Sequence, residues 1–402
     1  MSSLGKSLLA CMACALIATG AGAGLTIHSD YPGANITVER QESGTVYLRQ
    51  ELRDTDGWWF YWNFGVTGAP GETAAFRFTD GNVIGTRGPA ISLDSGLSWD
   101  WLGTDTVEKL QDGVAFRYTF TEAAPTVRFA FAPPYQATDL QKFLARHADH
   151  PGLAAETLCQ SEQGRAVERL RLGQLNGDAK YRILLTARHH SCESMASYVL
   201  EGLMDAMLGD SDDAVWFREH AEALVIPFVD KDGVEAGDQG KNRAPRDHGR
   251  DYQGESLYNS TRAIRAFVPA WSEGRLRFTL DIHCPHIRGG DNERVYQVGH
   301  PDPAVWAEQQ RFAECLAAIP DLPLPYAAAN DMPFGESWNK AGNYTAGAGV
   351  FKWAADLDGV RCATAMEIPY ANAGEVTVTP ENARAFGAAL LPAIRAWLAT
   401  GE

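Results

Sequence analysis

Residues 183–208 read ILLTARHHSCESMASYVLEGLMDAML. An apolar run from Ile183 to Thr186 leads through a polar turn into an amphipathic stretch from Glu193 to Leu208. A short apolar run that passes into helical periodicity is typical of a buried strand followed by a helix. These residues therefore predict one strand–helix unit of an α/β sheet.

The same alternation extends along the chain in both directions. Further buried strands are expected at 224–228 and 278–282, and further helices at 257–271, 304–319 and 380–398. This pattern predicts an α/β domain over residues 136–402, with a mixed, mostly parallel sheet flanked by helices. Active sites in such sheets gather at the carboxyl ends of the strands.

The preceding residues, 24–135, are expected to form an N-terminal β-sandwich domain. Short runs of strand-forming residues are separated by turn-rich pieces, and Pro133-Pro134 marks the boundary. The expected strands cover residues 36–38, 45–48, 58–66, 74–78 and 127–131.

Composition narrows the classes of function. The chain has 402 residues, 45% of them hydrophobic, and a net charge of -16, which disfavours binding to a nucleic-acid backbone. Five cysteines remain after residue 23, and their odd number and irregular spacing do not form a disulfide framework. The oligomeric state cannot be derived from these numbers.

The N-terminus resembles a secretory signal peptide over residues 1–23. Lys6 precedes an apolar run from Ser7 to Ala18, and small residues follow up to a cleavage site after Ala23. The apolar run is shorter than the roughly 20 residues that span a bilayer, so no stable membrane association is expected. If the leader is genuine, the protein is periplasmic or secreted; otherwise it is cytoplasmic.

Candidate metal ligands follow the strand at 183–186. His190 and Glu193 stand three residues apart at a strand-to-helix turn, where both can face one ion. Taken alone this spacing is weak, because a surface histidine beside a helix-start glutamate is equally common. A second strand delivers His283, with His286 as a rival three residues later. Two histidines and one glutamate form the ligand set of a catalytic zinc, one per chain.

A candidate general base lies on a third strand. Glu367 is flanked by Met366 and Ile368 in an apolar run, where burying a carboxylate costs free energy unless it has a role or a partner. A base beside a metal-activated water would give it that role, whereas the alternative is a strand-edge glutamate facing solvent.

Together these motifs resemble the zinc metallocarboxypeptidases, in particular the cytosolic-carboxypeptidase-like branch with its N-terminal β-domain. The segment 187–194 is similar to the branch's Ala-Arg-x-His-Pro-Gly-Glu-Ser, Asp281-Ile282-His283 to its Asp-Leu-His, and 365–367 to its Thr-Leu-Glu strand. The resemblance covers nearly the whole chain after the leader. It implies a carboxypeptidase fold and hydrolysis of the C-terminal residues of peptides or proteins.

The resemblance implies further site residues. In the segment 241–252, Arg243 would stabilise the oxyanion, Asp247 would orient His190, and Arg250 would bind the terminal carboxylate of the substrate. Tyr344 would close over the substrate. Two residues near the expected side-chain pocket suggest different substrates. Phe351 would suit an apolar C-terminal residue, whereas Lys352 would suit an acidic one.

Departures from the family pattern leave other functions open. Gly249 replaces an asparagine that would bind the terminal carboxylate, a loss of about 1–3 kcal/mol in binding. Cys192 and Cys284, each beside a ligand, are expected to be packing residues. The alternatives are a zinc-dependent amidase or deacylase of N-acyl amino acids, and a catalytically decayed peptide- or carbohydrate-binding protein.

Overall fold

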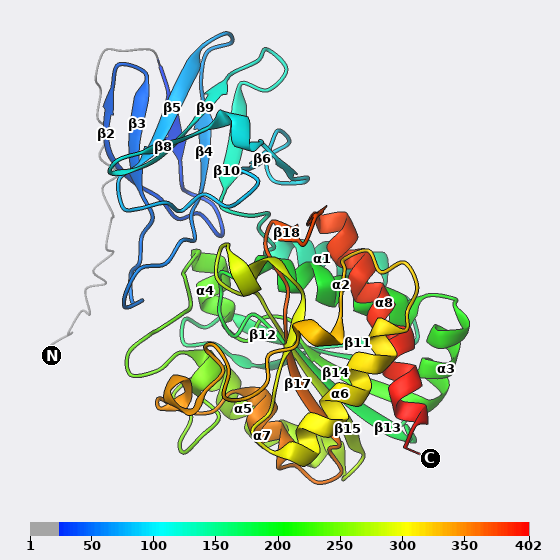
Figure 1. Ribbon diagram of the computed structural model, residues 1–402. Coiled ribbons are helices and arrows are strands. Elements are labelled where there is room, and N and C mark those ends of the chain that lie inside the picture. Colours follow the sequence, from blue (N-terminus) through cyan, green and yellow to red (C-terminus); the bar gives the residue numbers. More distant parts are fainter. Residues whose placement is uncertain (1–23, 402) are drawn as a thin grey trace, which may run out of the picture.

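The computed structural model describes residues 24–401, which form a β-sandwich followed by an α/β domain (Figure 1). The expected signal peptide, residues 1–23, lies outside the described residues. In the part that is described, no helix combines the length and apolar character needed to cross a membrane.

Two five-stranded sheets make up the sandwich, as the sequence predicts. One has the order β1-β4-β10-β6-β7 and the other β2-β3-β5-β9-β8. Aromatic rings fill the space between them: the centroids of Phe64 and Phe76 are 5.5 Å apart, and those of Phe116 and Phe129 are 4.9 Å apart. The strands are β1 (Thr26–His28), β2 (Thr37–Glu42), β3 (Thr45–Arg49), β4 (Asn63–Thr67), β5 (Thr73–Phe78), β6 (Ala90–Ser92), β7 (Asp100–Trp101), β8 (Val107–Leu110), β9 (Gly113–Thr119) and β10 (Thr126–Ala130).

Residues 58–62, expected as the start of a strand, lie outside the strands, and the backbone of Tyr61 is paired with the other domain. The Tyr61 N–H donates to Oε1 of Gln239 at 2.7 Å, and Nε2 of Gln239 donates to the Tyr61 carbonyl at 2.9 Å. These bonds to a distant side chain take the place of a strand ladder.

A seven-stranded mixed sheet forms the centre of the α/β domain, with the order β11-β12-β14-β13-β15-β17-β16. The four strands β14, β13, β15 and β17 run parallel, and the flanking pairings are antiparallel. The predicted mixed sheet is therefore confirmed, with its parallel part confined to the middle. The strands are β11 (Leu153–Gln160), β12 (Ala166–Gly173), β13 (Tyr181–Ala187), β14 (Ala221–Ile226), β15 (Leu276–His283), β16 (Tyr296–Val298) and β17 (Cys362–Glu367), with a separate hairpin of β18 (Asn372–Ala373) and β19 (Val376–Thr377).

Helices cover both faces of this sheet (Figure 1). On one face, the Phe278 ring of β15 packs against Phe312 of α6 and Trp397 of α8. On the other, α5 and α7 bury apolar residues such as Ile264 and Val350. The helices are α1 (Ala137–Arg146), α2 (Ser194–Leu208), α3 (Asp212–His220), α4 (Lys231–Ala236), α5 (Asn259–Ser272), α6 (Pro303–Ala317), α7 (Val350–Ala355) and α8 (Pro380–Ala399), with 3-10 turns η1 (Thr104–Thr106), η2 (His248–Arg250), η3 (Gly290–Glu293), η4 (Ala328–Asn330) and η5 (Ala341–Tyr344).

The parallel strands determine where the site forms. β13, β15 and β17 are hydrogen-bonded neighbours, and His283 is the register partner of Glu367 at their carboxyl ends. The turn after β13 carries His190 and Glu193 to the same edge. Residues that are far apart in the sequence thus meet at one end of the sheet.

Candidate metal centre and active site

His190, Glu193 and His283 converge with their donor atoms facing one another. Nδ1 of His190 lies 2.9 Å from Oε1 of Glu193, and Nδ1 of His283 lies 2.8 Å from Oε2. One ligand atom from each residue lies within 4.8 Å of the other two, and all three residues are buried. A buried carboxylate facing two imidazole nitrogens is a donor set that suits zinc.

The charge of Glu193 depends on its neighbours. Burial alone would raise the pKa of this carboxyl, but the positive charges of Lys241, His190 and His283 hold the pKa well below its ordinary value. Glu193 is therefore ionised, as a metal ligand must be.

A chain of hydrogen bonds orients His283 from behind. Its Nε2 lies 2.6 Å from Oδ2 of Asp281, whose Oδ1 accepts a bond from Thr186 Oγ1 at 2.7 Å. His189 joins the same carboxylate, with Nδ1 at 2.8 Å from Oδ1. Burial would raise the pKa of Asp281, but the two histidines lower it well below its usual range. An ionised Asp281 accepts the Nε2 proton of His283, which would leave Nδ1 as the atom available to a metal ion.

Asp247 lies behind His190, where the resemblance predicts it. Its Oδ1 is 3.7 Å from Nε2 of His190, longer than a hydrogen bond, and its Oδ2 accepts the backbone N–H of Asn242 at 2.9 Å. The position fits the expected orienting role through electrostatic attraction. Its assignment as the partner of His190 stays a prediction.

Glu367 is buried and 7% exposed, and it lines the cavity beside the metal ligands. Burial, together with the nearby charge of Glu193, raises its pKa despite the opposing charge of His283. Its Oε2 is buried without a protein hydrogen-bond partner among the described residues. A carboxylate with a raised pKa and a free oxygen toward a cavity is suited to proton transfer.

His286, the rival ligand, lies on the other side of the cavity. Its ring contacts the aromatic residues at 58–60 of the N-terminal domain, with a centroid distance of 5.1 Å to Phe60. His283, and not His286, contributes to the cluster of potential ligands found within residues 24–401.

The cavity has a volume of about 580 Å³ and is built by both domains. Asp56 and Trp59 line it from the N-terminal domain, and Arg250 and Tyr344 line it from the α/β domain. Arg250 is held by backbone carbonyls: Nε donates to Asn343 at 3.2 Å, and Nη1 donates to Gly249 at 2.9 Å. Both acceptors are neutral, so an incoming carboxylate would be a stronger partner for this guanidinium.

Gly249 packs directly against the metal-binding turn. A Cβ placed on it would lie 2.6 Å from Nε2 of His190 and 3.3 Å from Oδ1 of Asp247. The asparagine expected from the family cannot occupy this position unless the His190 ring moves. The close packing of the His190 ring therefore explains why a glycine stands at this position in place of the family's asparagine.

Phe351 and Lys352 point to different places. Phe351 lines the cavity together with Tyr296, Val298 and Ala365, which belong to one apolar cluster. Lys352 is not among the lining residues. Its Nζ lies 2.9 Å from the centroid of the Tyr344 ring, so its charge rests on that ring.

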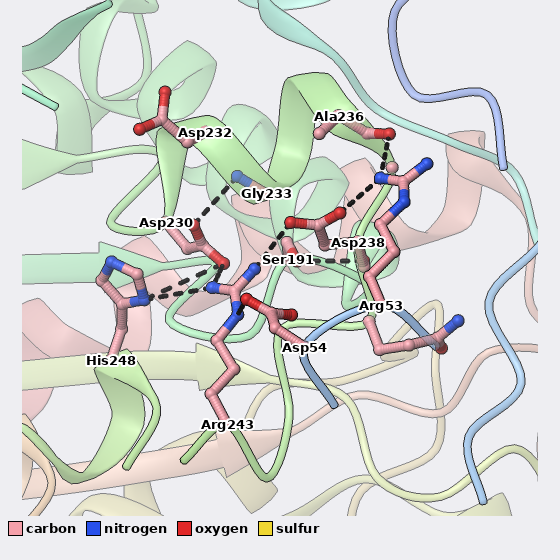
Figure 2. Close-up of polar contacts among 12 residues, drawn as sticks. Arg53, Asp54, Ser191, Asp230, Asp232, Gly233, Ala236, Asp238, Arg243 and His248 are labelled. Carbon is pink, nitrogen blue, oxygen red and sulfur yellow. Dashed lines mark hydrogen bonds and ion pairs between the residues drawn. The ribbon is translucent and has the colours of Figure 1, made fainter. Parts of the chain in front are cut away.

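Arg243, for which the resemblance implies an oxyanion role, lines the cavity, and its guanidinium is surrounded by carboxylates (Figure 2). Its guanidinium pairs with three carboxylates: Nε with Asp54 at 2.8 Å, Nη1 with Asp230 at 2.5 Å and Nη2 with Asp238 at 2.8 Å. Asp54 belongs to the N-terminal domain, and Arg53 of that domain also binds Asp238. The structure thus places Arg243 in a network that joins the two domains.

Several residues of the site carried no role in the sequence analysis. Lys241 lines the cavity and its Nζ contacts Oε1 of Glu193. Asp281 had a usable signal, since residues two apart on a strand share a face and Asp281 precedes His283 by two. Arg188, buried behind the turn, bonds to the Ser191 and Tyr135 carbonyls at 3.0 and 2.9 Å. Nothing local in the sequence indicates that contact.

Cys192 and Cys284 are buried among core residues, as expected of packing residues. Burial raises the pKa of the Cys192 thiol to about 12, which keeps it protonated and a poor ligand. All five cysteines of the described part are free.

Comparison with known proteins agrees with the fold. Residues 140–297 match the family model described as zinc carboxypeptidase. An uncharacterized protein of Zymomonas mobilis is 25% identical over 321 residues, which cover 77% of this chain and 81% of that protein. Mouse cytosolic carboxypeptidase 2 is 33% identical over 237 residues, covering 51% of this chain and 27% of that protein.

Among solved structures, a metallo-carboxypeptidase from Burkholderia cenocepacia has the same fold. Its TM-score is 0.77 at 21% identity, covering 94% of this chain and 100% of that chain. Residues 140–297 are thus similar to the zinc carboxypeptidase family, and the whole chain shares the fold of that metallo-carboxypeptidase. The matched region spans about a quarter of the length of mouse cytosolic carboxypeptidase 2.

Proposed function

We propose that this protein is a zinc-dependent carboxypeptidase that removes residues from the C-termini of peptides or proteins. The observation that carries the proposal is the convergence of His190, Glu193 and His283 beside Glu367 in one cavity. Two imidazoles and one carboxylate form the protein part of an open catalytic zinc site. Zinc held there would supply Lewis-acid activation of water and of the scissile carbonyl.

The protein side chains then divide the remaining work. Glu367 accepts a proton from the attacking water and passes it to the leaving amine, for which its raised pKa is suited. Asp281 and Asp247 hold the two histidines in orientation. Arg250 binds the terminal carboxylate, and Tyr344 covers it from the same side of the cavity.

We further propose that the preferred C-terminal residue is large and apolar. Phe351, Tyr296 and Val298 give the cavity an apolar wall, and the Lys352 charge is held on the Tyr344 ring. An acidic side chain would lose its hydration against this wall without gaining the Lys352 cation in exchange. Export through the leader at 1–23 is also proposed, with extracellular or cell-wall peptides as the substrates.

The test compares wild type with Glu367→Gln in zinc-loaded protein. We expect Glu367→Gln to keep one zinc per chain and to lose turnover, because glutamine is close in shape but cannot accept the proton. Glu375→Gln, an exposed site, is the matched control. Metal analysis and amino-acid release from peptides ending in Phe or Glu give both readouts.

Three results would contradict the proposal. Full turnover by Glu367→Gln would show that Glu367 is not the general base. Zinc with hydrolysis only of N-acyl amino acids would favour an amidase or deacylase, and absence of both zinc and hydrolysis would favour a binding protein. Faster release of Glu than of Phe would contradict the proposed side-chain preference alone.

A further inference from the structure

The segment that was expected to carry the oxyanion-stabilising charge brings both Lys241 and Arg243 to the cavity. Arg243 and Lys241 are two residues apart on this segment, and their charged groups have different partners. The three nearest partners of Arg243 are carboxylates from two domains, and its side chain is 7% exposed. Releasing it toward a substrate would take the nearest cation from Asp230, whose side chain is 2% exposed, and this is costly.

Lys241 meets the metal ligands instead. Its Nζ contacts Oε1 of Glu193, and the ammonium lies 5.3 Å from the centroid of the Trp59 ring. The side chain is 14% exposed and lines the cavity that Glu367 also lines. Of the lysines and arginines that line the cavity in residues 24–401, Lys241 is the one with an ion pair to a candidate ligand.

The backbone that carries Lys241 is fixed on both sides. The Asn242 N–H donates to Asp247 at 2.9 Å, and the Asn242 carbonyl accepts the Asp56 N–H at 3.2 Å. Thr55 and Arg243 form an isolated bridge between the domains. The fixed backbone keeps the lysine stem directed at the site, while its four-carbon chain lets the ammonium turn.

The geometry points to Lys241, rather than Arg243, as the catalytic residue that stabilises negative charge on the attacked carbonyl oxygen. This inference rests on the proposed function. When Glu193 serves as a metal ligand, the Lys241 ammonium turns from it to the carbonyl oxygen. In the reaction the water oxygen bonds to the carbonyl carbon and the C–N bond breaks. The proton travels to the amine through Glu367, and Lys241 contributes charge without exchanging a proton.

The test uses zinc-loaded wild type, Lys241→Met, Lys241→Arg and the exposed control Lys142→Met. We measure zinc content, kcat and KM, and the dissociation constants of two ligands. One is a phosphinic dipeptide, which carries a tetrahedral anion. The other is a dicarboxylic acid that mimics the released product.

Lys241→Met is expected to lower kcat about 10²–10³-fold, the loss typical of one oxyanion donor. It should weaken the phosphinic ligand by a similar factor, change the product mimic by less than about twofold, and keep one zinc per chain. Lys241→Arg should recover part of kcat, since it restores a cation, and Lys142→Met should match wild type.

Two outcomes would overturn the inference. One is a Lys241→Met variant with wild-type kcat and wild-type affinity for the phosphinic ligand. The other is loss of zinc with equal weakening of both ligands, which would make Lys241 a structural partner of Glu193. A wild-type protein that binds zinc and trims no peptide would instead contradict the proposed function, and is recognised before any variant is compared.

Discussion

Gly249 sets how closely the polypeptide approaches the metal-binding turn. The glycine lies under the His190 ring, and even a methyl group would come within 2.6 Å of Nε2. The ring would have to turn, and its Nδ1 would lose alignment with Glu193. In the proposed function the asparagine contact to a terminal carboxylate is missing, so Arg250 would carry more of that recognition.

We therefore predict that Gly249→Ala weakens zinc binding at least about tenfold and destabilises the fold by about 1–3 kcal/mol, as an overpacked core would. Competition with a chelating dye and thermal unfolding measure the two effects. Gly342→Ala is the control, since a Cβ there meets open space. Unchanged zinc affinity in Gly249→Ala would show that the His190 ring can move freely.

Lys352 gives a prediction about pH. Burial, and then the charge of Arg250, lower its pKa to about 8. The ammonium on the Tyr344 ring should therefore lose its proton near pH 8, well below the ordinary lysine value of about 10.4. Nuclear magnetic resonance of isotopically dimethylated lysines follows that titration directly.

Arg250→Met supplies the matched comparison for Lys352. Because the variant removes a repelling charge and keeps most of the burial, the Lys352 midpoint should move up, though not to the value of free lysine. A midpoint that is near 10.4 in wild type already would show that the ring contact forms only transiently.

At the scale of single elements, the turn between β13 and α2 depends on a buried guanidinium. Arg188 has a positive φ of 60° and bonds to the Ser191 and Tyr135 carbonyls and to Ser197 Oγ at 3.1 Å. These bonds hold the turn that carries two of the ligands against the rest of the domain.

Arg188→Met should leave those carbonyls without a donor and lower the free energy of unfolding by about 3 kcal/mol, at about 1–3 kcal/mol for each unsatisfied group. Zinc affinity should fall with it. Arg117→Met, at an exposed position of β9, is the control and should change neither quantity. Chemical denaturation and zinc titration check both. A stable variant with weak zinc binding would separate the two roles.

The central elements could be predicted because each has a local signal. Apolar runs marked β13, β15 and β17, and 3.6-residue periodicity marked α2 and α8 to within one or two residues. The antiparallel strands β11 and β12 at one end of the sheet were missed, since their half-exposed, mixed composition resembles loop sequence. Periodicity describes a strand or a helix but not its neighbours in space.

The candidate site likewise has a part that could be predicted from the sequence and a part that could not. His190, Glu193, His283 and Glu367 stand at the ends of predicted strands, so topology alone brings them together. The direction of the Arg243 side chain could not be predicted, because it depends on Asp54, which lies in the other domain and far away in the sequence. The role that the resemblance implies for Arg243 stays a prediction, at a segment whose side chains also contact the other domain.

For the whole molecule, the contact between the two domains is polar and closely packed. Asn35 Nδ2 donates to the Gly237 carbonyl at 2.7 Å, and a Cβ on Gly237 would lie 2.7 Å from the Gly33 carbonyl oxygen. Gln239, fully buried, bonds both backbone groups of Tyr61 and the Glu51 carbonyl. The domains should consequently unfold as one unit.

Gln239→Leu tests this coupling. The change leaves both backbone groups of Tyr61 unpaired, while the Glu51 carbonyl keeps Asn35 Nδ2, and should destabilise the protein by about 2 kcal/mol or more. Hydrogen exchange should rise together in 51–61 and 237–243, and kcat/KM should fall because Lys241 lies in the second segment. Gln163→Leu, exposed, is the control. Exchange confined to one domain would contradict the coupling.

The shared wall of the cavity has a consequence for the history of such a protein. Trp59 and Asp56 border the reaction space, and Asp54 fixes the segment that presents Lys241. A gene rearrangement that replaced the sandwich would remove part of the active site along with it. Selection on catalysis thus falls on both domains at once, and the two would be inherited and would diverge as a single piece.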